Sequence, residues 1–249
     1  MSGKLRSATD LENRVLELGF LPFFKNSVRG FSVQEMTAPE LWFSADDEGP
    51  WEWKGPVIRG LNCAYGKFFN GKAGYISLEW FPDFANWRRS ERPLDPSAAG
   101  DDFGISETLI LDTVREHESL VSKELKDLCG LTTRPRRRTA FDLIDTLEPL
   151  PLPKGKRHSG LEPAITRLQM STRIVIADFE YSISKSGTPY GWGLARYTTP
   201  EALYGADFLS AASSGGALRT PEESRARIFE RLAAIIPSAT CAQLSRLID

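Results

Sequence analysis

The stretch from Leu161 to Tyr197 constrains the fold more than any other part of the chain. It opens with Glu162 and Pro163, and both residue types are favoured in the first turn of a helix, where the N–H groups lack intrahelical partners. Residues 174–181 are rich in β-branched and aromatic side chains that alternate between two faces, which predicts a strand. Gly and Pro within residues 185–189 then predict a chain reversal and a returning strand. This order of a helix and a hairpin is typical of the end of a winged-helix domain.

Two further helices are predicted upstream of this stretch. Ser106 can cap a helix that carries apolar residues at helical spacing, and Ser122 can cap a shorter one that Gly130 ends. The expected fold class is therefore α+β, with winged-helix units made of a helix-turn-helix and a β-hairpin wing. A loop-rich interruption over residues 131–160 precedes the third helix, whereas a helix-turn-helix normally has a turn of a few residues there.

The composition along the chain suggests three regions. Residues 93–102 have the Pro, Gly, Ser and Asp content of a linker, which places a boundary near residue 100. We expect an aromatic-rich α+β region over 1–100, a winged-helix domain over 101–198 and C-terminal helices over 199–249 that pack on the rest. No internal repeat is evident in the sequence.

Five of the six tryptophans lie between Trp42 and Trp87, in a segment with many glycines and prolines. One interpretation is a core in which large rings fill the space between irregular loops and short strands. The other is a ring-lined pocket in which Trp51 and Trp53 stack on a planar base, with Glu52 and Lys54 at its lip. Both interpretations can hold together.

The formal charge of −2 and the pI of about 5.9 exclude a global field that attracts nucleic acid, so any attraction must be local. Residues 123–173 provide a local surplus, with eleven Lys or Arg against six Asp or Glu. Arg and Gln can each make two hydrogen bonds to a base edge, and loop cations can contact phosphates. The side chains predicted to contact double-stranded DNA are Arg136, Arg137, Arg138, Lys156, Arg157, Thr166, Arg167, Gln169, Arg173 and Lys185.

Cysteine and histidine usage argues against a metal centre. The three cysteines are widely spaced and odd in number, and the chain has two histidines, so we expect free thiols, no metal and no cofactor. No apolar run approaches the length that spans a membrane, and the N-terminal residues do not have the pattern of a leader. We therefore expect a cytoplasmic protein that does not enter the membrane.

Several stretches together resemble a bacterial family described as related to AlkZ, the winged-helix DNA glycosylases. The stretches that carry the resemblance are 19–24 (GFLPFF), 50–56 (PWEWKGP), 79–86 (EWFPDFAN), 166–170 (TRLQM) and 189–197 (PYGWGLARY). The resemblance implies several winged-helix units around a DNA channel, and removal of damaged bases by hydrolysis of the glycosidic bond.

The chain departs from the enzymes at the position of their catalytic residues. Those enzymes carry a glutamine, one spacer and a glutamine or aspartate shortly after a leucine-glycine pair, and these side chains activate the attacking water. If Leu18-Gly19 matches that pair, the two positions hold Pro22 and Phe24, and neither can act on water. The resemblance therefore implies the fold and a DNA-facing surface without the usual catalysis.

Three functions follow from these patterns. The first is a winged-helix DNA-binding protein of DNA repair or damage recognition. The second is an active nucleobase N-glycosylase that uses a different carboxylate, with Glu52, Asp178 and Asp83 as candidates. The third is a non-catalytic scaffold that binds a protein or a ligand.

Overall fold

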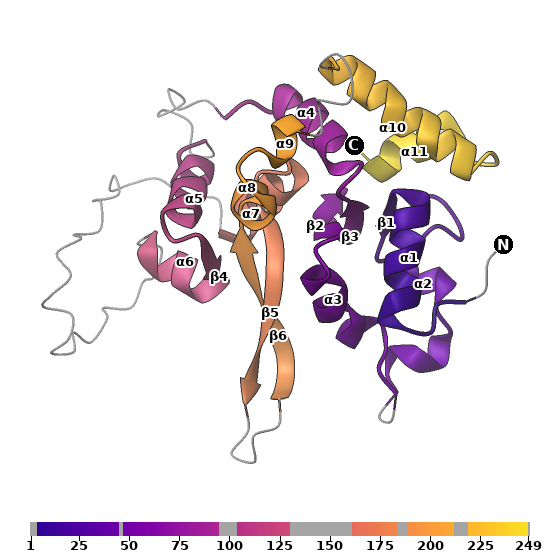
Figure 1. Ribbon diagram of the computed structural model, residues 1–249, viewed down its shortest axis with the longest axis horizontal. Coiled ribbons are helices and arrows are strands. Elements are labelled where there is room, and N and C mark those ends of the chain that lie inside the picture. The colour runs from indigo at the N-terminus through magenta and orange to yellow at the C-terminus, as the bar shows by residue number, and fades with distance from the viewer. Residues whose placement is uncertain are drawn as a thin grey trace, which may run out of the picture.

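The computed structural model describes residues 4–44, 47–94, 104–129, 161–183, 189–211 and 219–248. Its centre is a six-stranded antiparallel sheet with the strand order β1-β3-β2-β5-β6-β4. The α+β class predicted from the sequence is confirmed. Helices surround this sheet, and the β5–β6 hairpin projects from the body between two groups of helices (Figure 1).

The first three strands of the sheet come from the N-terminal part of the chain. The elements of this half are α1 (Ala8–Leu18), β1 (Phe20–Pro22), α2 (Val33–Met36), the 3-10 helix η1 (Pro39–Trp42), α3 (Pro50–Arg59), β2 (Cys63–Phe69) and β3 (Lys72–Ser77). Strand β1 pairs with β3, which also pairs with β2. The short first strand therefore closes back onto the hairpin that ends the half.

The other three strands come from a second half with the same order of elements. These are α5 (Gly104–Glu116), β4 (Ser119–Val121), α6 (Ser122–Leu128), α7 (Leu161–Met170), β5 (Val175–Ile183) and β6 (Pro189–Thr198). Strand β4 pairs with β6, and β6 also pairs with β5. In the first half, β1 pairs with β3 and β3 with β2 in the same way. The structure thus contains a repeat that the sequence does not reveal, because the two halves share topology rather than residues.

Residues 50–59 form helix α3, although the sequence suggested short irregular pieces here. Pro50 occupies the first helical position, where the missing N–H costs nothing. Pro56 lies inside the helix and removes one hydrogen bond. Trp53, Val57 and Ile58 lie fully buried on one face, and their burial offsets that loss.

The β2–β3 hairpin turns at Asn70 and Gly71, which have positive φ values of 50° and 70°. Asn-Gly is the preferred pair for a type I′ turn because both residues tolerate positive φ and because the twist of the turn matches that of the strands. This dipeptide is the local sequence signal for the β2–β3 hairpin.

Each half buries its third helix against the other half. Helix α3 packs against α1 and against β5, and α7 packs against α5 and against β2. The two halves therefore exchange equivalent contacts across the middle of the sheet. Gln169, one of the α7 residues predicted to contact DNA, is buried in this packing.

The remaining helices lie at one end of the sheet. They are α4 (Phe81–Glu91), α8 (Pro200–Tyr204), α9 (Phe208–Ala211), α10 (Pro221–Ile235) and α11 (Cys241–Ile248). Helix α10 lies along α4 (Figure 1), and Arg88 Nη2 donates a hydrogen bond to the carbonyl of Ile248 at 2.6 Å. Thr199 and Thr220 cap α8 and α10, since each hydroxyl accepts a hydrogen bond from a backbone N–H of the first turn. In the part of the chain described here, no helix has the length and apolarity needed to cross a bilayer.

Candidate nucleic-acid interface

Two aromatic rings and a cation lie close together at the junction of α3 and β5. Lys54 Nζ lies 4.8 Å from the centre of the Trp51 ring on the same helix and 4.2 Å from the centre of the Phe179 ring on β5. Burial lowers the pKa of Lys54 from 10.5 to about 8, and the nearby carboxylate of Glu52 partly opposes this shift. A half-buried ammonium is thus held between two aromatic faces.

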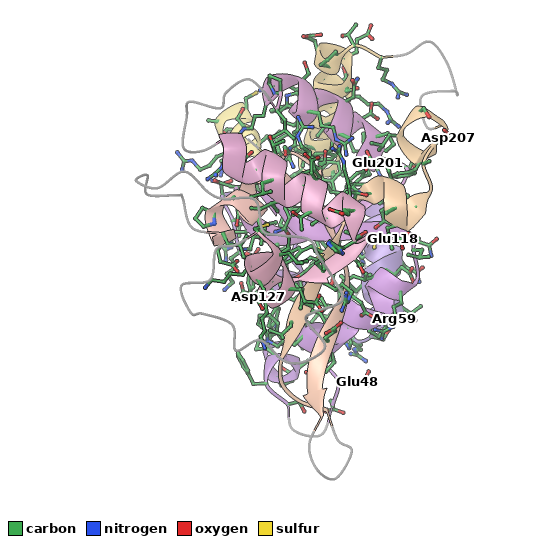
Figure 2. The ribbon with its side chains drawn as sticks, turned by 90° about the vertical axis from the view of Figure 1, so that its left-hand side faces the viewer. Glu48, Arg59, Glu118, Asp127, Glu201 and Asp207 are labelled. Atoms are coloured by element: carbon green, nitrogen blue, oxygen red, sulfur yellow. The ribbon has the colours of Figure 1, made fainter. Side chains whose placement is uncertain are left out.

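An ion pair closes the same junction one turn further along α3. Arg59 Nη1 lies 2.8 Å from Asp178 Oδ1, and Figure 2 shows Arg59 beside the long hairpin. Gly55 leaves room for this side chain, because a Cβ there would lie 2.9 Å from Arg59 Nη1. Asp178 Oδ1 also accepts a hydrogen bond from the Phe179 N–H. Asp178 therefore positions the Arg59 side chain and the backbone at the start of β5.

Tyr181 extends the aromatic surface along β5. Its ring and Phe179 lie over Gly193 of β6, where a Cβ would come within 2.9 Å of Tyr181 Cζ. Burial, Glu52 and Asp178 raise the pKa of the Tyr181 hydroxyl. With 39% of its surface exposed, Tyr181 is available to a ligand on the hairpin.

Glu52 is an exposed capping residue. Its Oε2 accepts a hydrogen bond from the Gly49 N–H at 2.8 Å, at the start of α3. The side chain turns back to the helix N-terminus, so it does not lie buried between the two tryptophans. Glu52 still lies close enough to Lys54 and Tyr181 to influence both pKa values.

The two candidate stacking tryptophans have different environments. Trp53 is 1% exposed and belongs to the core, so the expectation that it stacks on a base is wrong. Trp51 is half-buried and packs against Phe23, Phe24 and Trp42. The interpretation of the aromatic segment as a core is confirmed for most of its rings, and Trp51 remains at the edge.

Helix α7 engages the predicted base-reading residues in contacts within the protein. Gln169 is fully buried, and its Oε1 accepts the Lys67 N–H at 3.0 Å. The expectation that it reaches a DNA groove is wrong, because its position lies on the face that packs on β2. Arg167 forms an ion pair with Glu107 of α5, and the Thr166 hydroxyl accepts a hydrogen bond from Lys67 Nζ at 3.1 Å.

Arg173 serves the structure around the end of α4. Its Nη2 donates a hydrogen bond to the carbonyl of Arg92 at 2.7 Å. Burial lowers the pKa of the Arg173 guanidinium, and the positive charges of Arg89 and Arg115 lower it further. The remaining predicted DNA contacts are cations of the segments that precede α7 and that lie between β5 and β6 in the sequence. Arg136, Arg137, Arg138, Lys156, Arg157 and Lys185 lie outside the described residues.

Asp83 lies far from the α3–β5 junction, between α4 and α10. It is 3% exposed and is paired with Arg227 and with Arg219 Nη1, the latter at 3.3 Å. The small polar cavity beside it measures about 140 Å³. Two guanidinium groups neutralise this carboxylate, which suits a structural clasp between helices better than a base that activates water.

The structure therefore assembles one site from residues that the sequence suggested separately. Trp51, Glu52 and Asp178 meet at the α3–β5 junction, whereas Asp83 and the α7 residues do not join them. Lys54 lies beside the tryptophans in the sequence as well, whereas Arg59, Phe179 and Tyr181 join the site only in the structure. The alternation of Phe179 and Tyr181 on one strand face was the available signal.

The fold and this junction define an α+β chain in which two halves of equal topology share one sheet. Comparison with family models gives the family: the chain belongs to the AlkZ-related family, whose model matches residues 5–249. Searches of curated proteins and of solved structures found no match.

Proposed function

We propose that each half of the chain is a winged-helix unit and that the protein binds double-stranded DNA in damage recognition or repair. The observation that carries this proposal is the repeated order of helix, strand, two helices and hairpin, with the first strand paired to the last in each half. Winged helices are variants of the helix-turn-helix, a fold that many proteins use on DNA. Membership of the AlkZ-related family supports the same partner.

The proposed units correspond to residues 1–100 and 101–198, and the helices of residues 199–249 brace the first unit. The proposed contact surface is the α3–β5 junction and the hairpin that continues from it. It offers Lys54 and Arg59 as cations, and Tyr181 as an exposed ring for a sugar or a base. The basic residues Arg136, Arg137 and Arg138, which precede α7 in the sequence, are proposed to contact phosphates.

The proposed function excludes the usual catalysis of AlkZ-type enzymes. Pro22 lies in β1 opposite Gly74, and Phe24 packs on Phe23 and Trp51. A proline and a phenylalanine have no group that can orient or deprotonate water. DNA binding without that water-activating pair is therefore the function supported best.

The test is the salt dependence of binding to a fluorescent duplex, followed by anisotropy. Losing three phosphate contacts in the variant Arg136→Ala/Arg137→Ala/Arg138→Ala should flatten the slope of log K against log salt by about 2 to 3. Arg246→Ala is the matched control, because this exposed cation lies on α11, away from the junction. Absence of binding at low salt, or an unchanged slope in the triple variant, contradicts the proposal.

A further inference from the structure

Helices α3 and α7 have the same length of 10 residues and the same place in their halves, so their positions can be compared one by one. The fourth, eighth and ninth positions are buried in both helices, as Trp53, Val57 and Ile58 and as Ala164, Leu168 and Gln169. The fifth position differs in kind. It holds the fully buried Ile165 in α7 and Lys54 in α3.

Lys54 therefore places an ammonium at a position where the equivalent helix buries the aliphatic side chain of Ile165. Its Nζ faces the rings of Trp51 and Phe179. Within the described part of the chain, Lys54 forms no ion pair, because Glu52 caps Gly49 and Asp178 pairs with Arg59. A poorly solvated amine that forms no ion pair costs folding free energy even with Glu52 nearby, which favours a functional reason for its presence.

The same surroundings make the amine reactive. Desolvation lowers the pKa of Lys54 to about 8, so about a tenth of the side chain is neutral at pH 7, far more than for a solvated lysine. A neutral lysine amine in an apolar setting is the group that forms Schiff bases with carbonyl compounds. The flat faces of Trp51 and Phe179 leave the approach to Nζ apolar.

We propose that Lys54 condenses with the aldehyde of a ring-opened abasic deoxyribose in duplex DNA. This inference rests on the proposed function, since DNA brings the aldehyde to the α3–β5 junction. An abasic site is the electrophile in DNA that an amine can capture without a further reagent, and hydrolytic base loss supplies it. The aromatic faces beside Lys54 suit the gap that the missing base leaves.

The chemistry balances without an oxidant or a reductant. The lone pair of neutral Lys54 Nζ attacks the C1′ carbonyl carbon, and the carbonyl oxygen takes up a proton to give a carbinolamine. Loss of water breaks the C–O bond and forms the C=N bond of the imine, while nitrogen gives up its protons to the departing water and solvent. Addition of water reverses these steps and frees the lysine. The protein thereby holds the abasic site covalently but reversibly.

The test uses the full chain and a duplex oligonucleotide with one abasic site, in the presence of sodium cyanoborohydride, which reduces the imine to a stable amine. Wild type should form a covalent adduct on a denaturing gel, and peptide mass spectrometry should locate it on Lys54. The variant Lys54→Met should lose the adduct by about tenfold or more. Lys72→Met is the matched control, since Lys72 is an exposed lysine of β3 and its loss should leave the yield unchanged.

The pH profile separates this site from unspecific reaction of surface lysines. The rate of adduct formation should rise up to a pH of about 8 and then level off, where a solvated lysine would continue to gain reactivity. Anisotropy on the same duplex is recorded in parallel. Binding without an adduct, or an adduct that persists in Lys54→Met, overturns the inference and leaves the proposed function standing. Absence of binding overturns both.

Discussion

Tyr65 of β2 and Ile176 of β5 face each other across the middle of the sheet, and they occupy equivalent positions in the two halves. Tyr65 lies six residues beyond Arg59, the last residue of α3, and Ile176 lies six residues beyond Met170, the last residue of α7. Because the two strands are antiparallel and the paired residues are equivalent, the two halves are related by a local twofold axis between Tyr65 and Ile176.

The relationship extends over the whole sheet. A single row of paired residues crosses it in the order Leu21, Tyr75, Tyr65, Ile176, Tyr197 and Leu120. The row begins and ends with a leucine that is paired with a tyrosine, Leu21 with Tyr75 at one edge and Leu120 with Tyr197 at the other. All six side chains are buried, and the halves are therefore joined by a continuous core rather than by a linker.

Ile176→Ala should destabilise both halves together. Removing a buried isoleucine side chain costs about 2 to 5 kcal/mol, and the site of the loss lies between the halves. Five of the six tryptophans lie in residues 42–87, so fluorescence reports mainly the first half, whereas circular dichroism reports both. In urea, the two signals should give coincident transitions at lower denaturant. Leu194→Ala, at a side chain that is 53% exposed, is the control, and separate transitions for the two signals would refute the shared core.

Local elements of this fold could be predicted, whereas the pairing of the halves could not. The helix at Leu161 and the following hairpin were predicted because their signals are local: caps, alternation and turn residues. The β2–β5 contact joins strands far apart in the sequence, and no local pattern specifies it. Gln169 shows the same limit, because an amide on an amphipathic helix looks exposed until the strand that it contacts is known.

The candidate site was predicted in part for the same reason. Trp51 and Glu52 stand out in the sequence, as does the Lys54 beside them. Phe179 and Asp178, which complete the junction, come from the other half. Their approach to α3 depends on the antiparallel register of β2 and β5, which only the structure supplies.

Gln169→Leu should lower stability and leave DNA affinity unchanged. The Gln169 side chain accepts the Lys67 N–H at 3.0 Å inside the protein, and leucine leaves that donor unsatisfied. An unsatisfied buried donor costs about 1 to 3 kcal/mol. Chemical denaturation and duplex anisotropy on the same variant measure the two effects. Reduced affinity at unchanged stability would instead assign Gln169 to the DNA.

Asp83→Asn should destabilise the contact of α4 and α10 without changing DNA binding. The asparagine keeps the size of the side chain but leaves Arg219 and Arg227 without their shared carboxylate. Breaking a fully buried pair costs about 3 to 5 kcal/mol, and the partial exposure of both arginines reduces the expected loss to about 2 kcal/mol. Thermal unfolding measures it. Unchanged stability together with loss of an activity on DNA would return Asp83 to the list of catalytic candidates.

The three cysteines should differ in reactivity with a thiol reagent such as Ellman's. Cys241 is exposed, whereas Cys63 and Cys129 are buried. Burial, with Glu12 nearby, raises the pKa of Cys63 to about 12, and burial also raises that of Cys129, so little thiolate forms at neutral pH. Cys241 should react within the native protein and the other two after unfolding. Rapid native labelling that persists in Cys241→Ser would contradict the packing of the sheet at Cys63.

Lys54→Met should stabilise the protein at pH 7, and the gain should shrink as the pH rises. The pKa of Lys54 is about 8 in the folded state and near 10.5 in the unfolded chain, so the unfolded state binds more protons between these values. The penalty of the desolvated ammonium is complete below pH 8 and fades towards pH 10.5, where the side chain is neutral in both states. Methionine has no charge to desolvate and suits a position where α7 holds Ile165. Urea denaturation of both proteins at pH 7 and at pH 9.5 measures the difference, with Lys72→Met, at an exposed side chain of β3, as the control. A difference between wild type and Lys54→Met that stays constant over this range would mean that the ammonium is well solvated, and the lysine would then lose its claim to be a nucleophile.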